Sequence, residues 1–150
     1  TIRARDLRGA TVYTISDKAS DEVAHAVAAN ENKSDIYAGL PVASNNNDVS
    51  DILIDLMRRE TQKFSVNLAK TVVSSFNGKI RLINNPHRSA GFLVLKAPDV
   101  PSVLVELGYL SNPQDEKLLT TPNWRTQTAK LLVTAIEAYA ATHSNQVAKQ

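Results

Sequence analysis

Apolar residues along the chain form two kinds of pattern, which predict strands and helices. Short runs rich in β-branched and aromatic residues are typical of strands, and apolar residues recurring every three or four positions are typical of amphipathic helices. The strand-like runs cover residues 11–15, 80–83, 92–95 and 102–107. The helical patterns cover residues 20–30, 48–76 and 121–142, and a shorter helix begins at 111 with Gln114 at the capping-box position. This alternation predicts an α/β fold with a mixed, mainly parallel sheet and helices on both of its faces.

The long helical pattern over 48–76 has two unlike halves. From Lys63 onward the apolar residues form a single buried stripe, with Asn77-Gly78 closing the helix. The first half, which begins at Asp48, is apolar over most of its circumference. Its apolar residues include Ile52, Leu53, Leu56 and Met57. Such a helix either packs two faces internally or leaves one face for a partner.

Two stretches have no regular pattern. Residues 30–47 contain Gly39-Leu40-Pro41 and a run of three asparagines, which predicts a long loop. Because loops of that length are uncommon in compact domains, we interpret residues 30–62 as an inserted helical segment within a domain spanning 1–143. Residues 144–150 are expected to form a polar tail.

Composition excludes several classes of protein. The 150 residues contain no cysteine, so disulfides and thiolate chemistry are excluded, and no apolar run is long enough to span a membrane. A net charge of +2 and an aromatic content of 5% give little support to nucleic-acid binding, although Arg3, Arg5 and Arg8 cluster near the start.

Glu106 breaks the apolar pattern at the end of the run over 102–107. One interpretation is that the strand ends there and the carboxylate reaches water or an arginine. The other is an acid/base carboxylate at the carboxyl end of a sheet strand, where α/β proteins place ligands. The pattern alone leaves both open. The three histidines show no metal-binding spacing.

The contiguous stretch from Ala90 to Asn112, which includes Pro101-Ser102-Val103-Leu104-Val105-Glu106, resembles the signature of zinc-dependent N-acetylmuramoyl-L-alanine amidases. Gly9-Ala10-Thr11-Val12-Tyr13 is similar to a strand of the same catalytic domain. The resemblance implies a periplasmic enzyme of cell separation that cuts the bond between N-acetylmuramic acid and L-alanine in peptidoglycan. It also implies one Zn²⁺ held by His, Glu and His, with Glu106 as the catalytic carboxylate.

The family motifs that carry this zinc triad are not found in the 150 residues. In relatives the last of them lies just upstream of a segment like Thr1 to Val12, so the chain is expected to start immediately after it. We therefore expect these residues alone to bind no catalytic zinc and to be inactive. The alternative is a non-catalytic wall-binding or regulatory domain.

Residues between the first helix and Lys63 resemble an insertion that holds some of these amidases inactive. On this resemblance Glu31 is the candidate auto-inhibitory zinc ligand, and its alternative role is that of a solvated residue at a helix end. Ile52, Leu53, Leu56 and Met57 are then candidates for binding an activator protein of the LytM-domain type.

Overall fold

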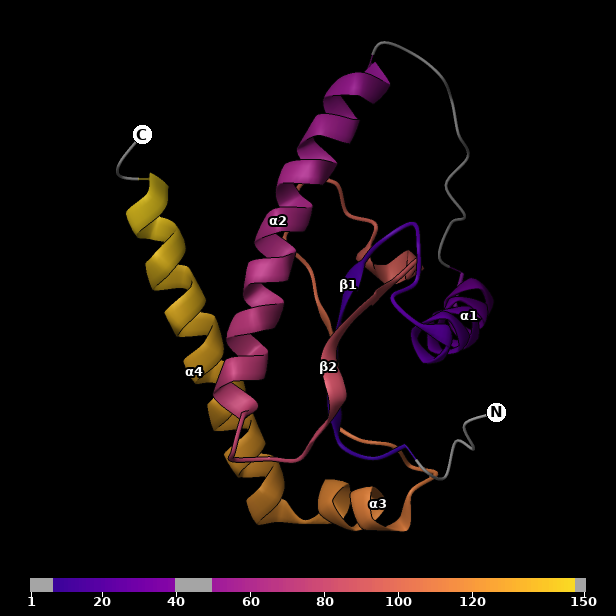
Figure 1. The fold of residues 1–150 in the computed structure, drawn as a ribbon, viewed down its shortest axis with the longest axis vertical. Coiled ribbons are helices and arrows are strands. Elements are labelled where there is room, and N and C mark those ends of the chain that lie inside the picture. The colour runs from indigo at the N-terminus through magenta and orange to yellow at the C-terminus, as the bar shows by residue number, and fades with distance from the viewer. Residues whose placement is uncertain (1–6, 40–49, 148–150) are drawn as a thin grey trace. The chain divides into compact units, whose positions relative to one another are not determined.

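The computed structural model describes residues 7–39 and 50–147 of the chain. In this part the elements are a strand β1 (Ala10–Ile15), helices α1 (Glu22–Tyr37) and α2 (Ser50–Phe76), a strand β2 (Leu82–Ala90), a 3-10 turn η2 (Leu93–Leu95), a strand β3 (Leu104–Glu106) and helices α3 (Pro113–Thr120) and α4 (Pro122–Val147) (Figure 1). These elements confirm the α/β class. No helix among residues 7–39 and 50–147 combines the length and apolarity needed to cross a bilayer.

The strands form a sheet in the order β2-β1-β3. Ala10 N donates to Arg81 O at 2.8 Å, and Ser16 N donates to Ala90 O at 3.0 Å, so β1 and β2 run in the same direction. Asp115 Oδ2 accepts hydrogen bonds from Gly9 N before β1 and from Tyr109 N after β3. The start of β1 therefore lies beside the end of β3, and this pair runs antiparallel.

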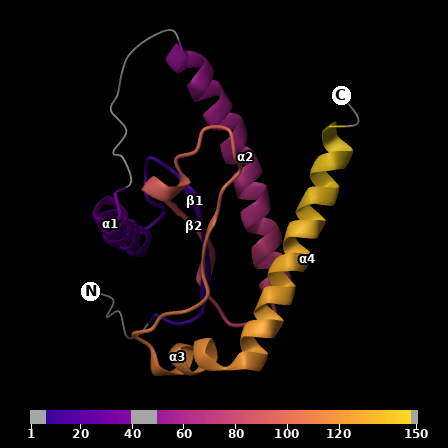
Figure 2. The same ribbon diagram turned by 180° about the vertical axis from the view of Figure 1, so that it is seen from behind.

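The described chain divides into two compact units, and the division falls inside β1, α2, β2 and β3. The unit containing residues 13–66 and 88–104 has a core of Tyr13 and Phe92, whose ring centroids are 5.0 Å apart, packed with Ala24 and Ala28 of α1. Asp21 caps α1 by accepting from Ala24 N at 2.9 Å, and it also binds the buried Arg88 at 2.8 Å. In both views α1 lies next to η2 (Figures 1 and 2).

The other unit contains residues 67–87 and 105–150, together with the segment up to Val12. The last turns of α2 bury Ala69, Val72 and Phe76, and α4 buries Leu131 and Ala135. Ser75 Oγ donates to Leu131 O at 2.7 Å, which joins these two helices. Helix α3 leads directly into α4 and packs against it (Figure 2).

Four expectations about element boundaries were wrong. Residues 84–88, expected as a loop, belong to β2, which bulges where Asn85 adopts a φ of 53°. The expected strand over 92–95 is the 3-10 turn η2. Helix α1 continues through residues 30–37 of the expected loop, and α4 continues to Val147 in the expected tail. Asp48, the expected cap of the long helix, lies outside the described residues.

Candidate functional site

Glu106 is the last residue of β3. It is half-buried, as are its two predecessors in the strand. The strand pairs with β1, whose side chains from Ala10 to Thr14 are buried. Glu106 is thus a carboxylate at the end of a sheet strand, next to a buried strand and partly open to solvent.

Asp115 is the buried acid of this region, and the sequence did not single it out. It is 3% exposed, and among the side chains that the structure describes it is the one buried Asp or Glu. Its Oδ2 accepts from Gly9 N at 2.8 Å and from Tyr109 N at 3.1 Å, and its Oδ1 pairs with Arg8 Nε at 3.3 Å. The three bonds compensate for the loss of water around the buried charge.

The start of α3 places this carboxylate. Asn112 has an extended backbone, and its side chain accepts from Gln114 N at 3.0 Å and Asp115 N at 3.3 Å, so Asn112 is the N-cap. Pro113 is the first helical residue, which puts Asp115 rather than Gln114 at the capping-box position. The sequence interpretation was therefore one residue out of register here.

Glu31 lies in the second half of α1 and is half-buried. The adjacent Asn32 has a defined role: its Nδ2 donates to Gly91 O at 2.8 Å, and its Oδ1 accepts from Leu93 N at 2.8 Å. Asn32 thus fixes this part of α1 to the start of η2. Glu31 and Glu106 belong to different units of the structure.

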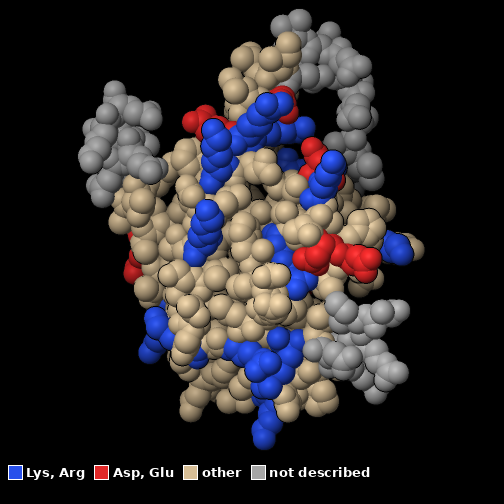
Figure 3. Space-filling view, viewed as in Figure 1, with Lys and Arg blue, Asp and Glu red and all other residues tan. Residues whose placement is uncertain are grey.

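The first half of α2 is exposed. Ile52 is 73% exposed, Leu53 65%, Leu56 64% and Met57 47%. Lys and Arg side chains also follow α2 on the face seen in Figure 3, and Arg59 pairs with Asp55 at 3.0 Å. Of the two possibilities for this over-apolar helix, the described residues show the unpacked one.

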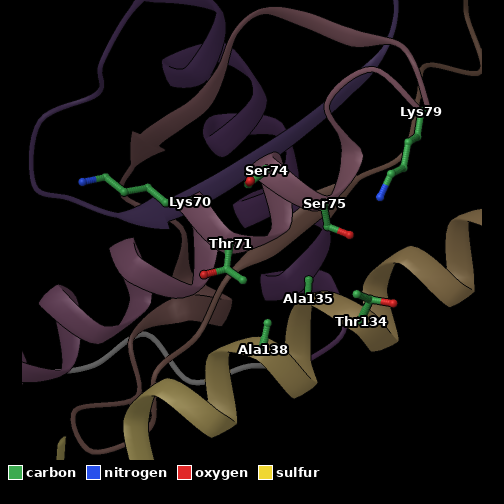
Figure 4. Close-up of a pocket in the computed structure, with 8 residues that line it drawn as sticks. All are labelled: Lys70, Thr71, Ser74, Ser75, Lys79, Thr134, Ala135 and Ala138. Atoms are coloured by element: carbon green, nitrogen blue, oxygen red, sulfur yellow. The ribbon is translucent and has the colours of Figure 1, made fainter.

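A pocket of about 470 Å³ lies between α2 and α4 (Figure 4). It is lined by Lys70, Thr71, Ser74, Ser75, Lys79, Thr134, Ala135 and Ala138. Figure 4 shows Ala135 and Ala138 facing α2, whereas Lys70 extends away from α4. The lining contains no carboxylate and no imidazole, so this pocket does not provide an acid/base pair.

The histidines and acids of the described residues form no metal centre. Within residues 7–39 and 50–147, no three His, Cys, Asp or Glu side chains lie close enough together to hold a metal ion. His25 is exposed, His143 stacks on Tyr139, and His87 is half-buried in β2. Burial, reinforced by the nearby positive charge of Lys70, lowers the pKa of His87. The described residues by themselves therefore do not fit the zinc site that the resemblance implies.

The arginine cluster near the start is only partly described. Arg3 and Arg5 lie outside the described residues, and Arg8 is paired with Asp115.

Comparisons with known proteins agree with the resemblance found in the sequence. AmiA of Salmonella typhimurium, an N-acetylmuramoyl-L-alanine amidase, is 32% identical over 93% of this chain and 49% of its own length. AmiC of Neisseria meningitidis, another such amidase, is 35% identical over 90% of this chain and 32% of its own length. The chain thus spans half or less of these two relatives.

The fold also matches a solved amidase structure. The crystal structure of Ami1 from Mycobacterium smegmatis, an N-acetylmuramyl-L-alanine amidase, superposes with a TM-score of 0.57 at 18% identity, covering 92% of this chain and 49% of that one. The family model described as N-acetylmuramoyl-L-alanine amidase matches residues 2–138. The chain therefore belongs to the N-acetylmuramoyl-L-alanine amidase family.

Proposed function

We propose that this chain is part of a peptidoglycan hydrolase that cleaves the amide bond between N-acetylmuramic acid and the L-alanine of the stem peptide. The observation that carries the proposal is the family match over residues 2–138, together with the half-buried carboxylate of Glu106 at the end of β3. Glu106 accepts a proton from the attacking water and passes it to the nitrogen of the leaving amine.

The proposed enzyme is zinc-dependent as a whole. Because the described residues do not fit a zinc site, its ligands have to come from other residues of the enzyme. The relatives, which are two to three times longer than the matched segment, have room for such residues. The enzyme acts on the cell wall in the periplasm during cell division, as the family resemblance implies.

Two further features belong to the proposal. Glu31 blocks the active site in the resting enzyme, supported by its place beside Asn32, which fixes α1 to η2. The apolar half of α2 binds an activator of the LytM-domain type, supported by the exposure of Ile52, Leu53, Leu56 and Met57.

The test of the proposed reaction is Glu106→Gln in the complete enzyme, assayed on dye-labelled peptidoglycan. We expect the rate to fall by roughly 10²- to 10⁴-fold, because the amide cannot accept the proton from water. Mass spectrometry of the wild-type products should show stem peptides with a free L-alanine amine.

Glu116→Gln is the matched control, because Glu116 is an exposed acid of α3 outside the proposed site. Its rate should equal that of the wild type. A Glu106→Gln enzyme that keeps the wild-type rate contradicts the role of Glu106. A complete wild-type protein that binds peptidoglycan but releases no products supports the non-catalytic alternative.

A further inference from the structure

The carboxylate of Asp115 joins the start of α3 to the segment just after β3, six residues away, and to the segment before β1, 106 residues away. It lies in the first turn of α3 and binds Gly9 N just before β1 and Tyr109 N just after β3. Both backbone donors reach the same oxygen, Oδ2, at 2.8 Å and 3.1 Å. The position of the backbone three residues beyond Glu106 is therefore set by this side chain.

The segment from Glu106 to Tyr109 has little freedom around that carboxylate. A Cβ atom added at Gly108 would lie 3.0 Å from Asp115 Oδ2 and 3.1 Å from its Cβ, so this position has no room for a larger residue unless Asp115 moves. The Tyr109 hydroxyl lies 3.4 Å from Thr11 Oγ1, within hydrogen-bonding distance of a buried residue of β1.

The backbone around Gly9, on the β1 side of Asp115, is also tightly packed. Gly9 has a φ of +106°, and a Cβ atom there would lie 2.8 Å from the carbonyl carbon of Leu82. Its N–H therefore reaches Asp115 from a backbone conformation that favours glycine. Arg8 Nε, 3.3 Å from Oδ1, neutralises the buried charge.

We propose that Asp115 is the positioning residue for the catalytic carboxylate: by holding Tyr109 N and Gly9 N on one oxygen, it fixes the path of residues 106–109 and so the direction of the Glu106 side chain. This inference rests on the proposed function of Glu106. Catalytic groups need such support, because a displacement of about 1 Å can cost roughly 100-fold in rate.

The experiment is a double-mutant cycle in the complete enzyme with Asp115→Asn and Glu106→Gln. Asp115→Asn keeps the shape of the side chain but replaces one carboxylate oxygen, a hydrogen-bond acceptor, by an NH2 group, which is a donor, and removes the negative charge. We expect kcat on peptidoglycan fragments to fall by about 10- to 100-fold with KM unchanged. Because Asp115 acts through Glu106, the double variant should be no slower than Glu106→Gln alone.

Gly108→Ala is the second route to the same displacement, since it leaves the Asp115 charge in place and pushes on the carboxylate through the new Cβ. It should lower kcat in the same way, and this loss too should disappear in the Glu106→Gln background. Gly78→Ala is the control for general destabilisation. Its φ of +71° makes alanine unfavourable but its surroundings are open, so Tm should fall while kcat stays unchanged.

Two outcomes overturn the inference and can be told apart. If Glu106→Gln is slowed as expected but Asp115→Asn and Gly108→Ala slow the residual reaction further in that background, Asp115 and Glu106 act independently, and only the positioning role is lost. If Glu106→Gln retains the wild-type rate, the proposed role of Glu106 fails, and the positioning role fails with it.

Discussion

Asp115 and Glu106 are acidic residues of the same unit, but they differ in how deeply they are buried. Asp115 is 3% exposed and its bonds are made to backbone N–H groups and to Arg8, so its charge is used within the fold. Glu106 is half-buried at the end of β3, so part of its side chain is open to solvent. Asp115, the proposed positioning residue, therefore lies only nine residues after Glu106, the proposed catalytic residue.

His87 should make the folding stability depend on pH. Burial and Lys70 lower its pKa in the folded state, so the unfolded chain binds more protons than the folded chain below about pH 6.5. The free energy of unfolding should therefore fall as the pH is lowered through that value. Urea denaturation at about pH 7.5 and 5.5 should show that His87→Gln loses less stability between the two conditions than the wild type does.

His25→Gln is the control for His87, because His25 is an exposed histidine of α1. It should keep the wild-type dependence on pH. If His87→Gln and the wild type lose stability equally, the lowered pKa of His87 has no effect on folding.

Elements with a local sequence signal were predicted, and elements set by distant partners were not. The strand β1 was predicted from its β-branched residues, and the start of α3 was predicted from its capping residues to within one residue of the observed N-cap Asn112. By contrast, β2 contains Asn85 and Pro86, which favour a loop, yet bonds between β1 and the backbone of Arg81 and Ala90 hold it as a strand. Tertiary pairing outweighed local propensity there.

The same distinction applies to the candidate site. Glu106 stood out because a charge interrupts an apolar run, which is a local signal. Two of the three partners of Asp115, Gly9 and Arg8, lie 106 and 107 positions away in the sequence, so the pattern of residues around Asp115 does not predict its burial. Asn32 likewise contacts a segment about 60 positions away.

The exposed half of α2 gives a prediction at the scale of an element. In the complete enzyme, Ile52→Asp combined with Leu56→Asp should abolish stimulation by the activator, because an apolar groove does not accept two charges. The fold and the basal rate should remain, since these side chains are 73% and 64% exposed. Stimulation is measured as the ratio of hydrolysis rates with and without the purified LytM-domain protein.

Val133→Asp combined with Ile136→Asp is the matched control, because these residues of α4 are 53% and 56% exposed. That variant should respond to the activator like the wild type. An insoluble or unfolded Ile52/Leu56 variant contradicts the prediction, because it means that this face is packed in the complete enzyme.

At the scale of the whole molecule, the chain spans half or less of the length of the two amidase relatives described above. It covers 49% of AmiA and 32% of AmiC, and its described residues bring a candidate acid/base group but no cluster of metal ligands. Regulation is therefore a property to be tested in the complete enzyme.

Glu31→Ala should raise the basal hydrolysis of the complete enzyme and reduce the further gain from the activator. The reason is that the blocking carboxylate is gone while α1 remains attached through Asn32. The rate on labelled peptidoglycan without activator is the measurement, and Glu22→Ala, an exposed acid in the first turn of the same helix, is the control. Equal basal rates in the wild type and Glu31→Ala count against auto-inhibition by this residue.

The Asn32 contact has an energetic consequence for such a switch. Beyond the buried Ala24 and Ala28, the end of α1 exposes Ile36 and Tyr37, and Asn32 holds it to η2 through its bonds to Gly91 and Leu93. Two hydrogen bonds contribute about 1–3 kcal/mol net, which corresponds to roughly a 5- to 150-fold preference for the attached end. Under the proposed auto-inhibition, detaching this end of α1 would cost no more than that at the Asn32 contact, so a binding protein would supply the energy without any chemical modification of the chain.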